Sequence, residues 1–173
     1  MTAFLVTGNP GSGKSVLARE LACRGLLAID PDDDRELSYW QDAAGNRVRG
    51  PQRPDEQWLG SHRWVWSRSR LQQVLAGHAG PVFVCGIAAN LEELLDVFDQ
   101  VFLLCLDGPA QEFRLAAYDA LHPPGRSPAV RQQIRAGRAT FQERMLRLGA
   151  IAVDGNAPPT AIADQLLALV AAT

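Results

Sequence analysis

The fold of this chain is decided by its residues 4–15, which read FLVTGNPGSGKS. The short apolar run 4–7 predicts a buried strand that ends at Gly8, and residues 15–23 carry apolar side chains at helical spacing. Between the two, residues 8–15 fit the pattern G-x-x-x-x-G-K-[ST] without a mismatch. Glycines in such a loop let backbone N–H groups turn toward phosphate oxygens, and the following helix directs the positive end of its dipole at the same point. The stretch therefore predicts a loop that holds the triphosphate of ATP or GTP.

We expect every residue of this loop to contact the nucleotide: Gly8, Asn9, Pro10, Gly11, Ser12, Gly13, Lys14 and Ser15. Lys14 is the only lysine in a chain with 17 Lys plus Arg, and it stands where a compact ammonium is needed to reach the β- and γ-phosphates. Ser15 is placed to give its hydroxyl to Mg²⁺, which bridges phosphate oxygens. The expected cofactors are thus ATP and Mg²⁺, with the choice between ATP and GTP left open.

The bulk composition points to one compact domain over residues 1–173. A hydrophobic content of 47% is ample for one core. The formal net charge of −2 gives no overall positive field for a polyanion, so nucleic acid is not favoured as a partner, although a local basic channel stays possible. No basic leader with a cleavage site and no apolar run of membrane-spanning length occurs, so we expect a soluble, cytoplasmic protein. The oligomeric state is not indicated.

Apolar runs and helical patterns alternate along the rest of the chain. Strands are expected at 4–7, 26–29, 81–86, 101–106 and 150–155. Helices are expected at 15–23, 61–78, 91–98 with Asn90 as its cap, 113–118 and its surroundings, about 130–148 and about 160–170. Strands that are apolar on both faces belong in a parallel sheet covered on both sides, so the pattern predicts a three-layer α/β/α fold with a five-stranded parallel sheet.

Two segments lack a regular pattern. Residues 31–60 are rich in Gly, Pro, Asp and Gln and are expected to run over the surface on the acceptor side. Residues 119–130 contain a run of prolines and are expected to form a mobile, lid-like loop.

The loop GNPGSGKS, the D-x-D formed by Asp30 and Asp32 at the end of the second strand, and the late arginine-bearing loop resemble the small P-loop kinases related to adenylate, shikimate and gluconate kinase. Only the phosphate loop is a specific sequence match, although the order of elements agrees over nearly the whole chain. The resemblance implies a strand order of 2-3-1-4-5, with the nucleotide at the carboxyl edge of the sheet and the acceptor beyond the second strand.

The resemblance also implies roles for the two acids. The third strand ends in Val84-Cys85-Gly86 and offers no acid for the metal, so Asp30 is expected to organise the Mg²⁺ shell together with Ser15. Asp32 is expected to face the acceptor hydroxyl and accept its proton. A solvated acidic turn is the alternative, and Asp33 and Asp34 are expected to be the solvated pair.

Arginines complete the expected site. By the same resemblance, Arg114 is expected beside the adenine, and Arg126 is expected to act in catalysis as a lid arginine over the phosphates. Arg131, Arg135 and Arg138 share a helix face, where one could supply charge at the transition state or all could be a solvated basic face. The chain departs from the group because prolines stand where relatives carry basic lid residues.

These observations predict an ATP-dependent kinase that acts on a small hydroxyl- or phosphate-bearing acceptor. A polynucleotide 5′-hydroxyl kinase is one alternative, because Asp32-x-x-Arg35 resembles that family. A regulatory nucleotide-binding protein with slow hydrolysis is the other.

Overall fold

The computed structural model describes residues 2–51, 54–121 and 126–171. Its central sheet consists of β1 (Ala3–Thr7), β2 (Leu27–Ile29), β6 (Val82–Cys85), β7 (Gln100–Cys105) and β8 (Ile151–Asp154). These strands lie in the order β2-β6-β1-β7-β8, and all their pairings are parallel. Counted within this sheet alone, that order is the expected 2-3-1-4-5.

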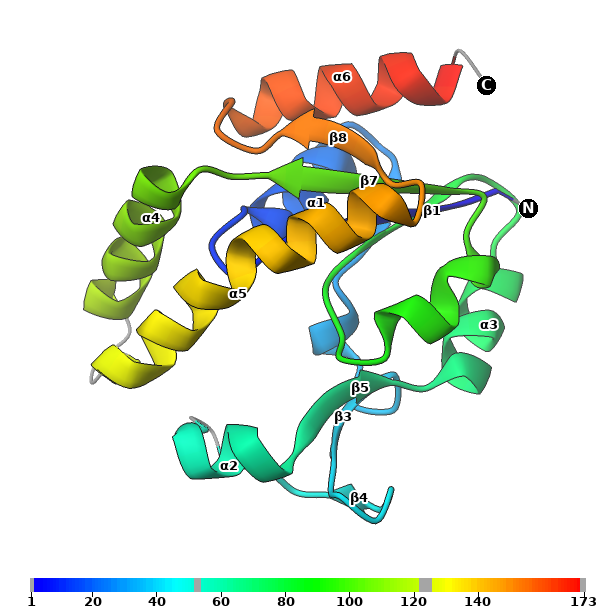
Figure 1. Ribbon diagram of the computed structural model, residues 1–173. Helices are drawn as coiled ribbons and strands as arrows, with labels where there is room; N and C mark the ends of the chain where they lie inside the picture. Colours follow the sequence, from blue (N-terminus) through cyan, green and yellow to red (C-terminus); the bar gives the residue numbers. More distant parts are fainter. Residues whose placement is uncertain (1, 52–53, 122–125, 172–173) are drawn as a thin grey trace.

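Helices cover both faces of the sheet, which gives the expected three layers (Figure 1). The helices are α1 (Lys14–Cys23), α2 (Glu56–Ser61), α3 (Arg68–Ala76), α4 (Gly108–Leu121), α5 (Pro128–Arg147) and α6 (Pro159–Ala171), with 3₁₀ segments η1 (Pro31–Asp33) and η2 (Leu91–Val97). None of the helices in the described ranges is long and apolar enough to cross a membrane.

The core has two halves because successive residues of a strand point to opposite faces of the sheet. On one face, Phe4 and Val6 of β1 pack with Leu17 of α1 and Ile162 of α6. On the other face, Leu5 belongs to the cluster that includes residues of α3 and α5. The central strand β1 is buried along its whole length, which fixes the phosphate loop at its carboxyl end.

A second, three-stranded antiparallel sheet lies between β2 and α3 in the chain. It has the order β4-β3-β5, formed by β3 (Ser38–Gln41), β4 (Arg47–Val48) and β5 (Arg63–Trp66). Residues 31–60 are therefore not a plain surface excursion, and the helix expected at 61–78 is wrong for its first third. Aromatic and β-branched residues 64–66 favour a strand, and that strand pairs with β3. The helix begins only after Ser67, whose Oγ accepts a hydrogen bond from the Arg70 N–H at 3.2 Å.

The expected helix over 91–98 is a 3₁₀ segment, and Asn90 does not cap it through its side chain. Instead the Asn90 amide holds the end of β5: Oδ1 accepts from the Trp66 N–H at 3.0 Å and Nδ2 donates to the Trp66 carbonyl at 2.9 Å. The Asn90 side chain is thus directed at the backbone of Trp66 and not at the first N–H groups of η2.

Candidate active site

The phosphate loop has the backbone that its glycines predict. Gly11 and Gly13 have φ values of 86° and 94°, in the left-handed region that favours glycine. Gly8 is needed for a different reason, because a Cβ there would lie 2.7 Å from Ser12 Oγ and 3.0 Å from the Leu104 carbonyl oxygen. Gly13 caps α1 without a side-chain acceptor, so an anion can take the place of that acceptor at the helix N-terminus.

The Lys14 ammonium folds back over this loop. Its Nζ donates to the Gly8 carbonyl at 2.7 Å, to the Asn9 carbonyl at 3.2 Å and to Ser12 Oγ at 3.5 Å. Desolvation lowers the pKa of Lys14 from 10.5 to about 8, and the negative charges of Asp32 and Asp30 oppose that shift only in part. A phosphate group in the loop would supply the missing counter-charge, as the sequence predicts for this lysine.

Two side-chain hydrogen bonds tie the phosphate loop to helices that are distant in the chain. Gln111 in α4 is fully buried, and its Nε2 donates to the Pro10 carbonyl at 3.1 Å. Asn9 donates through Nδ2 to the Arg138 carbonyl of α5 at 3.2 Å. Gln111 could not be expected at the loop from the sequence, because a glutamine in a helix carries no signal for a contact 101 positions away in the chain.

Arg114 joins the phosphate loop to the loop after β8. Its guanidinium donates to the carbonyls of Ser12 at 3.3 Å, Gly155 at 2.8 Å and Asn156 at 3.5 Å. Beside it lies a cavity of about 240 Å³ whose lining, mostly apolar, comes from α1, Arg114 and the start of α6. The cavity adjoins Ser12 and Gly13 of the phosphate loop, and the expected place of Arg114 beside the adenine stays a prediction.

The acids after β2 form a short turn that faces Lys14. Asp30 caps η1, and its Oδ1 accepts from the Asp32 N–H at 3.1 Å. Asp32 in turn accepts through Oδ1 a hydrogen bond of 2.9 Å from Trp64 Nε1 of β5. Desolvation raises the pKa of Asp32 above its ordinary value, although the Trp64 bond acts in the opposite direction. The structure thus brings Lys14, Asp30 and Asp32 close enough for their charges to interact.

Solved structures of other proteins share this fold. No protein family matches the sequence, and no curated protein matches it. Among solved structures, the chain is similar to shikimate kinase from Acinetobacter baumannii in complex with shikimate, with a TM-score of 0.62 and 18% identity over 99% of this chain and 94% of that one. It is similar to a gluconokinase from Sinorhizobium meliloti 1021, with a TM-score of 0.53 and 18% identity over 98% and 91%. It also resembles deoxyadenosine kinase from M. mycoides with bound dATP, with a TM-score of 0.58 and 11% identity over 98% and 99%.

The fold is that of the small P-loop kinases. At these identities the likeness concerns the fold, so the roles of individual residues rest on the contacts in this chain.

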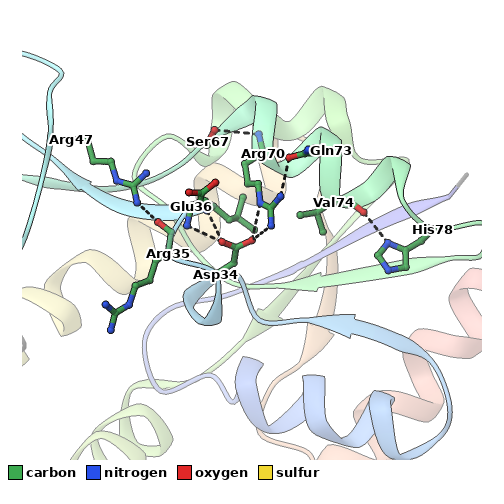
Figure 2. A network of polar contacts seen from close by, with 10 residues as sticks. Asp34, Arg35, Glu36, Arg47, Ser67, Arg70, Gln73, Val74 and His78 are labelled. Atoms are coloured by element: carbon green, nitrogen blue, oxygen red, sulfur yellow. Dashed lines mark hydrogen bonds and ion pairs between the residues drawn. The ribbon is translucent and has the colours of Figure 1, made fainter.

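One expectation about the acidic run is wrong for this P-loop kinase fold. Asp33 is exposed as expected, but Asp34 is part of the network in Figure 2. Its Oδ2 pairs with Arg70 of α3 at 2.9 Å, and its Oδ1 accepts from the backbone N–H groups of Glu36 at 2.8 Å and Leu37 at 3.3 Å. Partial desolvation alone would raise the pKa of Asp34, but these hydrogen bonds hold it below its ordinary value. Asp34 therefore anchors the acidic turn to α3.

Gly86, at the carboxyl end of β6, has a packing reason to be glycine. A Cβ at this position would meet the ring of the buried Trp66, and it would lie 3.0 Å from Pro31 Cδ. Pro31 immediately precedes Asp32 in the chain, so Gly86 and Trp66 set how closely the acidic turn approaches the sheet. The nearest atoms to this position belong to protein side chains.

Arg126 precedes α5, and Arg131, Arg135 and Arg138 lie on it; α4 and α5 extend together away from the sheet (Figure 1). Arg126 pairs with Asp119 at 2.7 Å and lies 4.8 Å from the centre of the Tyr118 ring, at the end of α4 opposite to Gln111. Arg135 pairs with Glu112 at 3.3 Å, and Arg138 donates to the Leu106 carbonyl at 3.0 Å. The structure therefore does not bring Arg126 to the phosphate loop, and residues 122–125 of the expected lid lie outside the described residues.

Proposed function

We propose that this protein transfers the γ-phosphoryl group of ATP to a hydroxyl group of a small acceptor. The observation that carries the proposal is the placement of Asp32 beside Lys14, with one carboxylate oxygen held by Trp64. A carboxylate that is held in place and whose pKa is raised above its ordinary value is suited to accept a proton from a hydroxyl. The same negative charge would repel a phosphate group at the point of attack, which favours a hydroxyl over a phosphate as the acceptor.

The residues of the site have separate roles in binding ATP and in accepting the proton. The loop N–H groups and Lys14 bind the triphosphate, and the cavity beside Arg114 takes the base. Trp64 occupies Asp32 Oδ1, so Oδ2 remains to accept the hydroxyl proton while the acceptor oxygen bonds to the γ-phosphorus and the bond to ADP breaks. ADP leaves with the electron pair of the broken bond, and the proton stays on Asp32 until solvent removes it.

Mg²⁺ fits the residues at this edge of the sheet. Ser15 is exposed in the first turn of α1, and Asp30 uses only Oδ1 for the Asp32 N–H. One or two protein oxygens together with phosphate oxygens are the usual ligands of Mg²⁺ in such sites. When bound, the ion neutralises phosphate charge that would oppose attack. Ser15 and Asp30 are the residues that would hold it.

The test is a panel of small hydroxyl compounds, nucleosides and oligonucleotides, with ATP consumption and product mass as readouts. We expect ATP turnover to rise with a small hydroxyl compound, and Asp32→Asn to lower kcat by about 10² or more while the Kd for ATP stays unchanged. Asp33→Asn is the matched control and should keep wild-type kcat.

Other outcomes identify the alternatives. Turnover that no acceptor stimulates favours the regulatory protein, and transfer to oligonucleotide 5′ ends favours the polynucleotide kinase. A Kd for ATP that weakens in Asp32→Asn as much as in Lys14→Ala would contradict the role of Asp32 as a base.

A further inference from the structure

A large hollow lies against the small sheet, on the acceptor side of the acidic turn. Its volume is about 800 Å³, and its walls come from β3, β4, the residues that flank them and Trp64 of β5. Trp64 is shared with the site described above, because its Nε1 donates to Asp32. The hollow and the phosphoryl-transfer site are therefore neighbours across one indole ring.

In the described ranges, all the charged side chains that line this hollow are positive. Arg35, Arg47 and Arg49 line it, and no carboxylate of the described residues does. In the part of the chain that the structure describes, none of these arginines forms an ion pair with an acid. Arg47 lies 5.0 Å from the centre of the Tyr39 ring and donates to the Arg35 carbonyl at 2.5 Å. Figure 2 shows the side chain of Arg35 directed away from the Asp34–Arg70 pair.

This arrangement stands out in a chain whose net charge is −2. Arg68 and Arg70 of the nearby helix α3 each pair with an acid, in contrast to the three arginines of the hollow. Three guanidinium groups around one hollow without a counter-charge create a local positive potential that an anion would relieve.

The inner wall supplies an independent sign of a ligand. Ser38 lines the hollow and is only 3% exposed, yet its Oγ has no hydrogen-bond partner among the described residues. A buried hydroxyl without a partner is costly unless something else bonds to it. Trp40 and Trp64 pack edge to face at 5.2 Å and give the same wall an apolar surface.

We propose that this hollow binds the acceptor, and that the acceptor carries an anionic group, a carboxylate or a phosphate, in addition to its hydroxyl. Arg35, Arg47 and Arg49 bind the anion, Ser38 hydrogen-bonds a polar atom of the ligand, and the two indole rings contact its carbon skeleton. The hydroxyl then lies on the Asp32 side of Trp64. The proposal rests on the proposed function only for the placement of that hydroxyl end.

The experiment measures binding with pairs of compounds that differ in charge: gluconate and glucose, shikimate and its methyl ester, and deoxyadenosine 5′-monophosphate and deoxyadenosine. Calorimetric titrations are made with and without a saturating, non-hydrolysable ATP analogue, because the analogue keeps these anions out of the phosphate loop. We expect the anionic member of at least one pair to bind about 10-fold or more tightly than its neutral partner in the presence of the analogue. That advantage should shrink as salt is raised.

Variants locate the anion site. Arg35→Ala and Arg49→Ala should each weaken binding of the preferred anion by about 10-fold, with Arg49→Lys restoring part of the affinity and the neutral partner unaffected. Arg147→Ala, an exposed arginine at the end of α5, is the matched control and should change nothing. Unchanged thermal unfolding of the variants excludes a loss of fold.

The proposal is overturned if no anion binds better than its neutral partner, or if the arginine variants bind the anion as the wild type does. The carboxylate pairs and the phosphate pair distinguish the two kinds of anion. Arginine-dependent binding without any phosphoryl transfer would contradict the proposed function while leaving the anion site in place.

Discussion

Replacing Asp34 with Ala should loosen the turn that carries Asp32 without touching the nucleotide site. The Asp34 carboxylate holds two backbone N–H groups and the Arg70 guanidinium, so the substitution removes one cap-like group and one ion pair. Loss of a capping carboxylate costs about 1 kcal/mol, and a partly exposed ion pair contributes up to about 1 kcal/mol. Together they predict a loss of about 2 kcal/mol in the free energy of unfolding, or roughly 4–8 °C in Tm for a chain of this size.

The effect should depend on pH in a defined direction. The folded-state pKa of Asp34 lies below its ordinary value of 3.8, so its contribution to stability is present above pH 3.8 and is lost as the pH falls through the lower folded value. The difference in stability between wild type and Asp34→Ala should therefore be constant near neutral pH and shrink in acid.

Urea unfolding at several pH values measures this, with Asp33→Ala as the control one position earlier. Asp33 is exposed, and we expect its substitution to change stability by less than about 0.5 kcal/mol. A double-mutant cycle with Arg70→Ala isolates the ion pair. In an acceptor assay, Asp34→Ala should lower kcat and leave the Kd for ATP unchanged. Equal stabilities of Asp34→Ala and Asp33→Ala would refute the anchoring role.

Three further predictions concern the site itself. Lys14→Ala should abolish phosphoryl transfer and greatly weaken ATP binding with an unchanged melting profile; near-wild-type turnover would contradict the nucleotide assignment. Trp64→Phe removes the hydrogen bond to Asp32 and should lower kcat by about 10-fold at unchanged Kd for ATP, whereas Trp58→Phe should not. Gly86→Ala forces a Cβ against the Trp66 ring and should destabilise the fold by about 1–3 kcal/mol, as urea unfolding would show; wild-type stability would mean that the ring has room to move.

The parts of the fold that the sequence predicts are those with local signals. The phosphate loop is a contiguous motif, and each of the five parallel strands is an apolar run that can be recognised from a few residues. The order of those strands came from the resemblance to a known group of kinases. Lys14 belongs to the motif itself, whereas the roles of Asp30 and Asp32 were implied by the resemblance and stay predictions.

The features that escaped prediction depend on contacts between distant positions. Strand β5 exists because Trp66 and Trp64 pair with Ser38 and Trp40, and nothing near residue 64 in the chain reveals that partner. The Asp34–Arg70 pair joins positions 36 apart, so Asp34 looked like one more solvated acid. The resemblance placed Arg126 in a lid over the phosphates, but Asp119, seven positions earlier in the chain, pairs with the same guanidinium.

The two ends of the small sheet are fastened to each other. The Ser67 N–H donates to the Leu37 carbonyl at 2.8 Å, so the chain leaves the core and returns to it at almost one point. A segment whose ends already touch can be lengthened, shortened or exchanged with little change in the closure entropy of the rest. Residues 38–66 could therefore be grafted onto a different protein of this fold, or replaced here, while the five-stranded sheet stays intact.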